Sequence, residues 1–215
     1  MSDSVTGATT DPKQARSKQT KEKIVLAAIE LFQARGYEKT TSNDIAAAAG
    51  VSVGSFYVYF VDKRQLLLTI FDRLADDVFK VIFDGLNPEH LFDEQLRPMI
   101  RDAVSRAIED KCRHSGLIRV ISEMVLKDPD FRAKQKEMMG RSVARIRELI
   151  SLSRKAGITW EIDVDAAAFV VQRVVNDISQ DVATGIFDFD KEKGIDAVTD
   201  MIYRFLFKAS IPEHH

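Results

Sequence analysis

The 215-residue chain contains a single cysteine, Cys112, which excludes an internal disulfide and is typical of a reducing compartment. It has no run of about 18 apolar residues, the length a membrane-spanning helix needs. The N-terminus lacks the basic-then-apolar layout of a signal peptide. With 45% hydrophobic and 30% charged residues, the composition is that of a globular protein of one or two domains. We therefore expect a cytoplasmic protein that does not enter membranes.

Motifs of the common enzyme classes are also missing. The chain has no G-x-G-x-x-G, no P-loop, no H-E-x-x-H and no G-x-S-x-G, so it lacks the usual phosphate cradles, zinc ligands and nucleophile turns. Only two of its four histidines, His90 and His114, lie outside the C-terminal tail, and they suggest no metal site. We therefore expect no enzymatic activity, no metal and no cofactor.

Between residues 41 and 65 the chain has the pattern of two short helices joined by a tight turn. Thr41 and Asp44 have the [ST]-x-x-[DE] spacing of a capping box, in which each side chain satisfies a backbone N–H of the same turn. Gly50 stands where a helix must end, because glycine adopts the left-handed conformation without a steric penalty. Ser52 is a good N-cap for a second helix that runs to about Phe60. The pattern predicts a helix-turn-helix, whose second helix enters the DNA major groove. An ordinary corner between two helices is the alternative.

The flanking segments extend this pattern. An amphipathic helix that begins at about Ile24 precedes it and is closed by Gly36, and another helix opens after it at Asp62. The positions that carry a family resemblance are Ala28, Leu31, Phe32, Gly36, Tyr37, Thr40, Thr41, Asp44, Ile45, Ala46, Ala49, Gly50, Val51, Ser52, Gly54, Tyr57, Phe60 and Lys63. On these residues, the block from about Arg16 to Leu67 resembles the N-terminal DNA-binding domain of tetracycline-repressor (TetR) family transcription regulators. The block covers about a quarter of the chain, and the rest matches the family only in length and helical character.

The resemblance implies which residues contact phosphate groups. It assigns this role to Thr41, to the backbone at the second helix's N-cap, Ser52, to the Tyr57 hydroxyl and to Lys63. Such contacts position a protein on DNA but carry no sequence information.

Base reading is expected from side chains early in the second helix. The outward candidates by position are Val53, Gly54, Ser55, Tyr57 and Val58, while Phe56 and Phe60 are expected in the core. Val53 and Tyr59 depart from the common family pattern, since many members have a polar or basic residue at the first position and histidine at the second. We therefore expect readout to rely on Ser55, on contact with thymine methyl groups and on DNA shape.

The charge is distributed unevenly along the chain. Residues 13–64 hold nine Lys or Arg and five Asp or Glu, a balance of +4, so the remainder must sum to −6 for the net charge of −2. This asymmetry indicates a basic nucleic-acid-binding head on an acidic body. The first basic side chains can lie along phosphates or enter a minor groove, or they can form a merely solubilising tail. They are Lys13, Arg16, Lys18, Lys21 and Lys23.

Helical periodicity and helix breakers predict an all-α fold of about nine helices, because no strand-length segment with a period of two is present. We expect a disordered tail at residues 1–15, a three-helix helix-turn-helix DNA-binding domain at 16–62 and a helical ligand-binding and dimerisation domain at 63–215. The helices expected after the motif span about 62–83, 92–113, 117–126, 130–156, 163–184 and 192–209.

The family resemblance also implies that the middle helices enclose a pocket for a small effector that changes DNA affinity. We expect a small hydrophobic or amphipathic molecule of unidentified structure. The candidate pocket residues by location are Phe71, Leu74, Met99, Val104, Ile108, Ile121 and Met124, each of which could instead be ordinary core.

The last two helices carry more apolar surface than one neighbour can bury. Two such helices from each chain, packed about a two-fold axis, would form a four-helix bundle and hence a homodimer. The expected interface residues are Val170, Val171, Val174, Val175, Ile178, Ile202, Phe205 and Leu206. The alternative is that these helices form only the core of one chain.

Together these features predict a homodimeric, ligand-responsive transcription regulator. In the family it resembles, such a protein is most often a repressor released from a pseudo-palindromic DNA operator by its effector. Two other classes stay open. One is a helical ligand carrier that has lost DNA binding, which the apolar Val53 at an expected base-reading position would fit, and the other is a helical enzyme.

Overall fold

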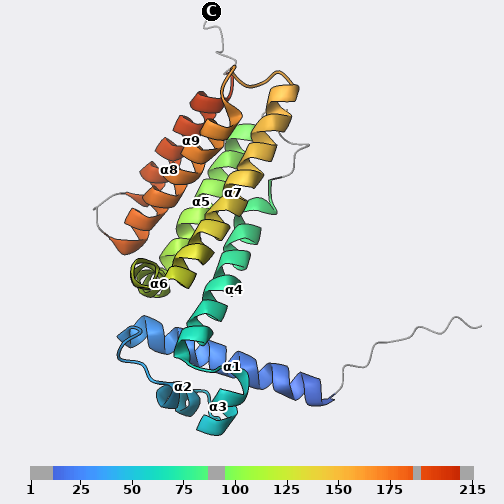
Figure 1. Ribbon diagram of the computed structural model, residues 1–215. Coiled ribbons are helices and arrows are strands. Elements are labelled where there is room, and N and C mark those ends of the chain that lie inside the picture. Colours follow the sequence, from blue (N-terminus) through green and yellow to red (C-terminus); the bar gives the residue numbers. More distant parts are fainter. Residues whose placement is uncertain (1–11, 87–94, 186–189, 209–215) are drawn as a thin grey trace, which may run out of the picture. The chain divides into compact units, whose positions relative to one another are not determined.

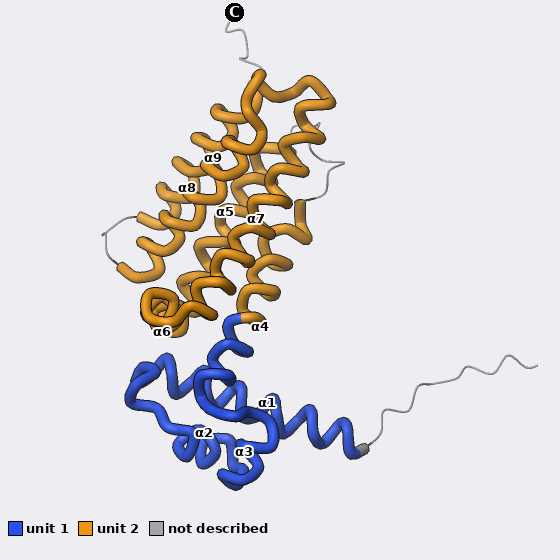
Figure 2. The backbone as a smooth tube through the Cα atoms, viewed as in Figure 1, with its two compact units in different colours: residues 1–71 blue, residues 72–215 orange. Residues whose placement is uncertain are grey.

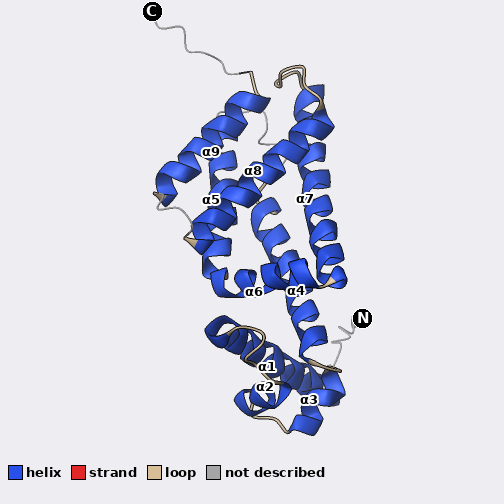
Figure 3. Ribbon diagram, turned by 60° about the vertical axis from the view of Figure 1, so that its left-hand side comes forward, coloured by secondary structure: helices blue, strands red, loops and turns tan. Residues whose placement is uncertain are grey.

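The computed structural model describes residues 12–86, 95–185 and 190–208, and within these ranges the chain forms nine α-helices and no β-strand (Figure 1). The expected all-α fold of about nine helices is therefore confirmed for this part of the chain, which consists of helices and connecting loops (Figure 3). The helices are α1 (Pro12–Arg35), α2 (Ser42–Ala48), α3 (Val53–Tyr59), α4 (Lys63–Phe83), α5 (Leu96–Arg113), α6 (Ser115–Lys127), α7 (Pro129–Lys155), α8 (Val164–Thr184) and α9 (Lys191–Leu206).

The chain divides into two compact units, residues 1–71 and residues 72–215 (Figure 2). The division falls inside α4, whereas the sequence placed the boundary before that helix, between residues 62 and 63. The reason is that the first turns of α4 are not merely a connector, since Leu66, Leu67 and Ile70 are buried. They belong to unit 1.

Unit 1 consists of α1, α2, α3 and the start of α4. α1 packs on α2 and α2 packs on α3. The buried apolar side chains are Ile24, Val25, Ala27, Ala28, Phe32, Ile45, Ala46, Phe56, Phe60, Leu66, Leu67, Ile70 and Phe71. Because α1 buries only residues from Ile24 onward, its first three turns are a polar helix that adds little to this core.

Several boundaries differ from those expected. α1 begins at Pro12, so the disordered tail expected at residues 1–15 is wrong for residues 12–15, and residues 1–11 lie outside the described ranges. The expected start of the next helix at Phe92 and the expected end of the last at Ala209 also lie outside them. α6 begins at Ser115, two residues earlier than predicted.

Unit 2 is built around α5, which packs against α8 and α9, while α7 packs against α6 and α8 (Figure 1). Apolar residues from α5, α7, α8 and α9 form one continuous core. Its buried members are Leu96, Val104, Ile108, Leu149, Ile150, Ala167, Ala168, Val171, Ile195, Val198, Ile202, Leu206 and Phe207.

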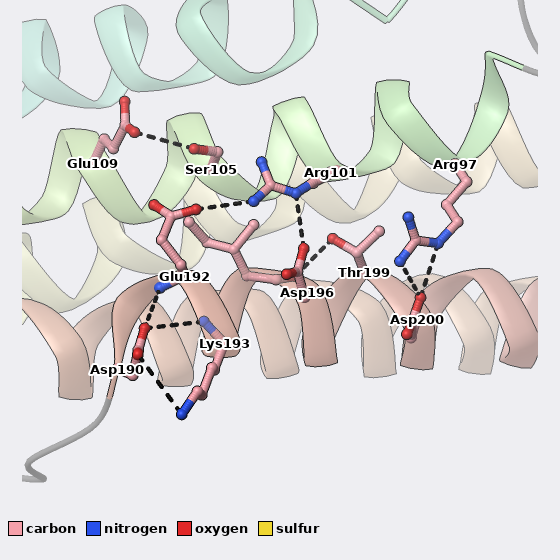
Figure 4. Close-up of polar contacts among 11 residues, drawn as sticks. Arg97, Arg101, Ser105, Glu109, Asp190, Glu192, Lys193, Asp196, Thr199 and Asp200 are labelled. Carbon is pink, nitrogen blue, oxygen red and sulfur yellow. Dashed lines mark hydrogen bonds and ion pairs between the residues drawn. The ribbon is translucent and has the colours of Figure 1, made fainter.

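An exposed row of ion pairs follows the contact between α5 and α9 (Figure 4). Arg97 donates to Asp200 from Nε at 2.9 Å and from a terminal nitrogen at 2.6 Å. Arg101 donates to Asp196 at 2.8 Å and to Glu192 at 2.9 Å. These residues lie at the rim of the apolar contact and fix the register of the two helices.

Candidate nucleic-acid interface

The N-terminus of α2 is closed by the capping box that the sequence predicts. The Asp44 backbone N–H donates to Thr41 Oγ1 at 3.1 Å, and the Thr41 N–H donates to Asp44 Oδ2 at 2.9 Å. The Thr41 hydroxyl also donates to Asp44 Oδ2 at 2.7 Å. The hydroxyl bond, followed by the backbone bond, holds the pKa of the Asp44 carboxyl below its usual value. The hydroxyl hydrogen of Thr41 is therefore used within the box, and a phosphate would have to compete for it.

The turn between α2 and α3 has the geometry that its sequence indicates. Gly50 has φ of +65°, a conformation that favours glycine, and the Val51 N–H donates back to the Ala46 carbonyl at 3.0 Å. Ser52 then caps α3, since its Oγ accepts from the Ser55 N–H at 3.0 Å. The Ser52 and Ser55 hydroxyls are 2.8 Å apart and share a hydrogen bond. The candidate base reader Ser55 is thus held at the first turn of α3.

α3 has one buried and one exposed face. Phe56 and Phe60 are buried, as expected of core residues. On the other face Val53, Tyr57 and Val58 are 40%, 54% and 77% exposed. A Cβ at Gly54 would meet only Ser52 Oγ at 3.8 Å, so packing within the chain does not require glycine there. These observations leave an exposed helix face with almost no hydrogen-bonding side chain.

Tyr57 and Tyr59 differ in their environment. Tyr57 stands edge-on to the Phe56 ring, with centroids 5.3 Å apart and planes at 85°, an arrangement that holds its ring while the residue stays exposed. Tyr59 is half-buried. Tyr57 is therefore the tyrosine of α3 that is better placed to meet a partner.

Lys63 is engaged within unit 1, which its place in the sequence did not reveal. Its Nζ donates to the Tyr37 carbonyl at 2.9 Å and to the Thr40 carbonyl at 3.0 Å. It also lies 4.2 Å from the centroid of the Tyr37 ring. Two of the three ammonium hydrogens thus hold the loop between α1 and α2, and one is left for a phosphate.

The first three turns of α1 extend the basic character of unit 1. Their five basic side chains are exposed, and Lys21 Nζ lies 5.5 Å from the centroid of the Phe60 ring. This contact places part of the basic row beside the C-terminal end of α3. The exposed basic residues are Lys13, Arg16, Lys18, Lys21 and Lys23.

The residues expected to line an effector pocket do not form one group. Phe71 is the last residue of unit 1, and the other six belong to unit 2. Val104 and Ile108 are part of the core shared with α8 and α9. Ile121 and Met124 are buried but lie outside that core, and Leu74 and Met99 are half-buried.

The expected dimer residues divide into three sets by burial. Val171, Ile202 and Leu206 are buried in the core of unit 2, because they lie on the inner faces of α8 and α9. Val170 and Phe205 are exposed, and the half-buried members are Val174, Val175 and Ile178. Phe169, which the sequence placed on the wide apolar face of α8, is also exposed, and so is Met201, which the sequence did not single out.

Neither a metal cluster nor a membrane helix is found among the described residues. No group of three or more His, Cys, Asp or Glu in these ranges could hold a metal ion. Similarly, no helix there is both long and apolar enough to cross a membrane.

Comparison with known proteins connects the helix-turn-helix to a family. Residues 24–70 match the family model of bacterial regulatory proteins of the tetR family. The chain is 23% identical to the HTH-type transcriptional repressor BepR of Brucella suis biovar 1 (strain 1330), over 93% of this chain and 98% of that protein. It is 25% identical to the probable acrEF/envCD operon repressor of Escherichia coli (strain K12), over 89% of this chain and 88% of that protein.

Solved structures share the fold. A putative TetR-family regulator from Mesorhizobium loti MAFF303099 aligns with a TM-score of 0.73 and 20% identity, over 90% of this chain and 99% of that one. A putative transcriptional regulator from Saccharomonospora viridis in complex with choline aligns with a TM-score of 0.71 and 18% identity, over 89% of this chain and 100% of that one.

Proposed function

The chain is a helix-turn-helix transcription regulator of the TetR family, and we propose that it is a homodimeric repressor released from its operator by a small effector. The operator is a pseudo-palindromic DNA duplex, since two identical heads related by a two-fold axis read two inverted half-sites. The protein acts in the cytoplasm, where it meets that DNA.

The exposed face of α3 is the observation that carries the DNA-binding part of the proposal. The exposed side chains of Val53 and Val58 suit apolar contact with thymine methyl groups. Gly54 has no side chain, although packing within the chain does not require glycine there, so the helix backbone can approach the DNA closely at this position. Ser55 is the side chain at the start of the helix that can hydrogen-bond a base edge. Tyr59, half-buried near the end of the helix, is a secondary candidate.

Phosphate contacts come from the residues around this face. The α3 N-terminus, capped by Ser52, presents backbone N–H groups and a positive dipole end to an anion. Tyr57 reaches a phosphate through its hydroxyl. At the start of α2, a phosphate competes with the Asp44 carboxylate for the Thr41 hydroxyl hydrogen. Lys63 acts on binding indirectly, through the loop that it holds by donating to the Tyr37 and Thr40 carbonyls.

Exposed apolar side chains on α8 and α9 support the homodimer. Phe169, Val170, Met201 and Phe205 are 58%, 41%, 37% and 40% exposed in one chain. The two helices pack against each other, so a second copy of the same pair can cover these side chains. Large apolar interfaces of this kind are typical of obligate homodimers.

The effector is proposed to be a small hydrophobic or amphipathic molecule bound in unit 2. The similar structure from Saccharomonospora viridis is a complex with choline, which supports a small organic effector for this chain. A ligand that binds one of two conformations more tightly shifts the protein toward that conformation, and DNA that prefers the other conformation lowers the affinity for the ligand by the same factor.

DNA binding can be tested by fluorescence anisotropy on duplexes selected from a random pool. We expect selection of an inverted repeat and a steep fall of affinity with salt, of about −0.9 in log–log slope per phosphate contact. Equal affinity for the scrambled repeat, or affinity that stays flat between low and moderate salt, would contradict the proposal. That outcome would favour the ligand-carrier alternative.

A further inference from the structure

A second polar row lies on α5, on a different side from the ion pairs with α9. Arg106, Asp110 and His114 are spaced four residues apart, so they follow one another along one face of the helix. At 3.6 residues per turn, Asp110 is about 120° around the helix from Val104 and about 160° from Ile108, which face the core. The row therefore occupies a face that the packing with α8 and α9 does not use.

Asp110 is the most enclosed member of the row. Its side chain is 8% exposed, and Oδ2 accepts no hydrogen bond from any described residue. His114 Nδ1 lies 3.6 Å from Oδ2 but only 3.0 Å from the Asp110 backbone carbonyl, so the imidazole is directed to the backbone. The sequence did not suggest that these two residues act together.

Arg106 closes the row one turn earlier. A terminal nitrogen of its guanidinium is 3.0 Å from Asp102 and 3.4 Å from the Ile82 carbonyl near the end of α4. A Cβ at Gly85 would lie 2.5 Å from the guanidinium, so glycine is needed for the arginine to lie there. Its Nε is enclosed and, within the described ranges, makes no hydrogen bond.

Two enclosed atoms without a partner on the same face of α5 are the unusual feature. Among the described residues, three enclosed side-chain polar atoms have no hydrogen-bond partner, and two of them are Arg106 Nε and Asp110 Oδ2. An enclosed polar group without a partner costs free energy, and a charged one costs more, so such groups call for an explanation. Three positions before Arg106 and three before Asp110, this face carries the small side chains Ala103 and Ala107.

We propose that Asp110 is the anchor of the effector site and that the effector is an amphipathic amine. Its protonated primary or secondary nitrogen would donate to Asp110 Oδ2 and neutralise the carboxylate, and its apolar body would lie along Ala103 and Ala107. This inference rests on the proposed function, because it gives the effector its chemical class. A neutral hydroxyl would leave the charge in place, and a quaternary ammonium would bring charge without a hydrogen to donate.

Four probes with one chain length separate these possibilities. Octylammonium, octyltrimethylammonium, 1-octanol and octanoate are titrated into the full-length protein by isothermal calorimetry. We expect octylammonium to bind at least tenfold more tightly than the other three. In Asp110→Asn this preference should be lost, with at least a tenfold weaker affinity for octylammonium. Glu109→Gln is the matched control, because Glu109 is an exposed carboxylate next to it that bonds Ser105, and it should bind as the wild type does.

Comparable binding of 1-octanol and octylammonium to the wild type would overturn the proposal without any variant. So would unchanged octylammonium affinity in Asp110→Asn, above all with a lowered melting temperature, because Asp110 would then be a structural residue satisfied by water. Without probe, Asp110→Asn should melt at or above the wild-type temperature.

Operator binding distinguishes this inference from the proposed function. Wild type and Asp110→Asn should bind selected duplexes alike without probe, and octylammonium should release only the wild type. Absence of DNA binding in both proteins, with selective amine binding intact, would refute the repressor and leave the amine site standing. DNA binding that octylammonium does not weaken would refute Asp110 as the effector anchor.

Discussion

Replacing Lys63 by methionine should destabilise the loop between α1 and α2 and weaken DNA binding without removing a phosphate contact. The lysine ammonium joins the Tyr37 and Thr40 carbonyls at 2.9 and 3.0 Å and lies over the Tyr37 ring. Methionine keeps an unbranched apolar stem but ends one atom short of Nζ and cannot donate. The loop leads into Thr41, the N-cap of α2, so loss of order in the loop would also loosen the start of the helix-turn-helix.

The magnitude follows from the contacts that are lost. A hydrogen bond to a charged group contributes about 1.5–3 kcal/mol when enclosed, but Lys63 is half-buried, so we take about 2 kcal/mol for the two bonds together. The contact with the ring adds about 0.5–1 kcal/mol. The free energy of unfolding of unit 1 should therefore fall by about 2–3 kcal/mol.

Hydrogen exchange measured by mass spectrometry, together with DNA titrations at several salt concentrations, can check this. In Lys63→Met the amides of residues 36–45 should lose protection, while the slope of log affinity against log salt should stay at the wild-type value. Lys39→Met is the control, since Lys39 is an exposed lysine of the same loop. Unchanged protection with a slope reduced by about one would refute the reasoning and make Lys63 a phosphate contact.

Three further predictions concern other parts of the chain. Tyr57→Phe should weaken binding to all duplexes alike and Ser55→Ala should alter site preference in a selection experiment, and a reversal of these effects would exchange their roles. Val170→Glu with Phe205→Glu should give a folded monomer by analytical ultracentrifugation, with operator affinity lost, because both side chains are exposed in one chain; a dimer would place the interface elsewhere. Burial lowers the pKa of Lys111 to about 8, so between pH 8 and 10.5 the unfolded chain still holds a proton that the folded chain has lost. The free energy of unfolding, measured in urea, should therefore rise by up to about 3 kcal/mol over this range relative to Lys111→Met. A flat difference over that range would show that Lys111 is not buried as a cation.

The turn between α2 and α3 could be predicted from the sequence because each of its signals is local. The Thr41–Asp44 box, the positive φ of Gly50 and the Ser52 cap depend on residues within three or four positions of one another. Local chemistry of this kind is legible in a single chain, since no distant neighbour is needed to complete it.

The start of α1 shows how composition misleads. Residues 12–15 carry no large apolar side chain, and low apolar content suggested disorder. Yet Pro12 is suited to the first helical position, and the lysines, glutamines, alanine and arginine after it are good helix formers. The helix that begins at Pro12 is continuous with the turns that Ile24 and Ala28 bury, so its first part does not have to bury anything itself.

Contacts between distant residues could not be predicted in the same way. Periodicity marked Val171, Ile202 and Leu206 as apolar, but it could not say that the neighbours covering them belong to the same chain. Likewise Lys63 meets carbonyls some 23 to 26 positions earlier, and Lys111 donates to Asn176 on α8. A charged residue's role depends on what encloses it, and that is a tertiary property.

α5 illustrates this dependence within one helix. Its outer row, Arg97 and Arg101, pairs with α9 through exposed contacts at 2.6–2.9 Å, and exposed ion pairs typically contribute only about 0–1 kcal/mol each because water screens them. The row of Arg106, Asp110 and His114 has longer and fewer contacts. The free-energy cost of the unpartnered Asp110 Oδ2 is nevertheless larger than the gain from an exposed ion pair, because the oxygen is enclosed. The ion pairs drawn in Figure 4 therefore align α9 on α5, whereas Asp110 is the carboxylate from which an amine ligand would gain binding free energy. A ligand gains most from the groups that the fold leaves unsatisfied.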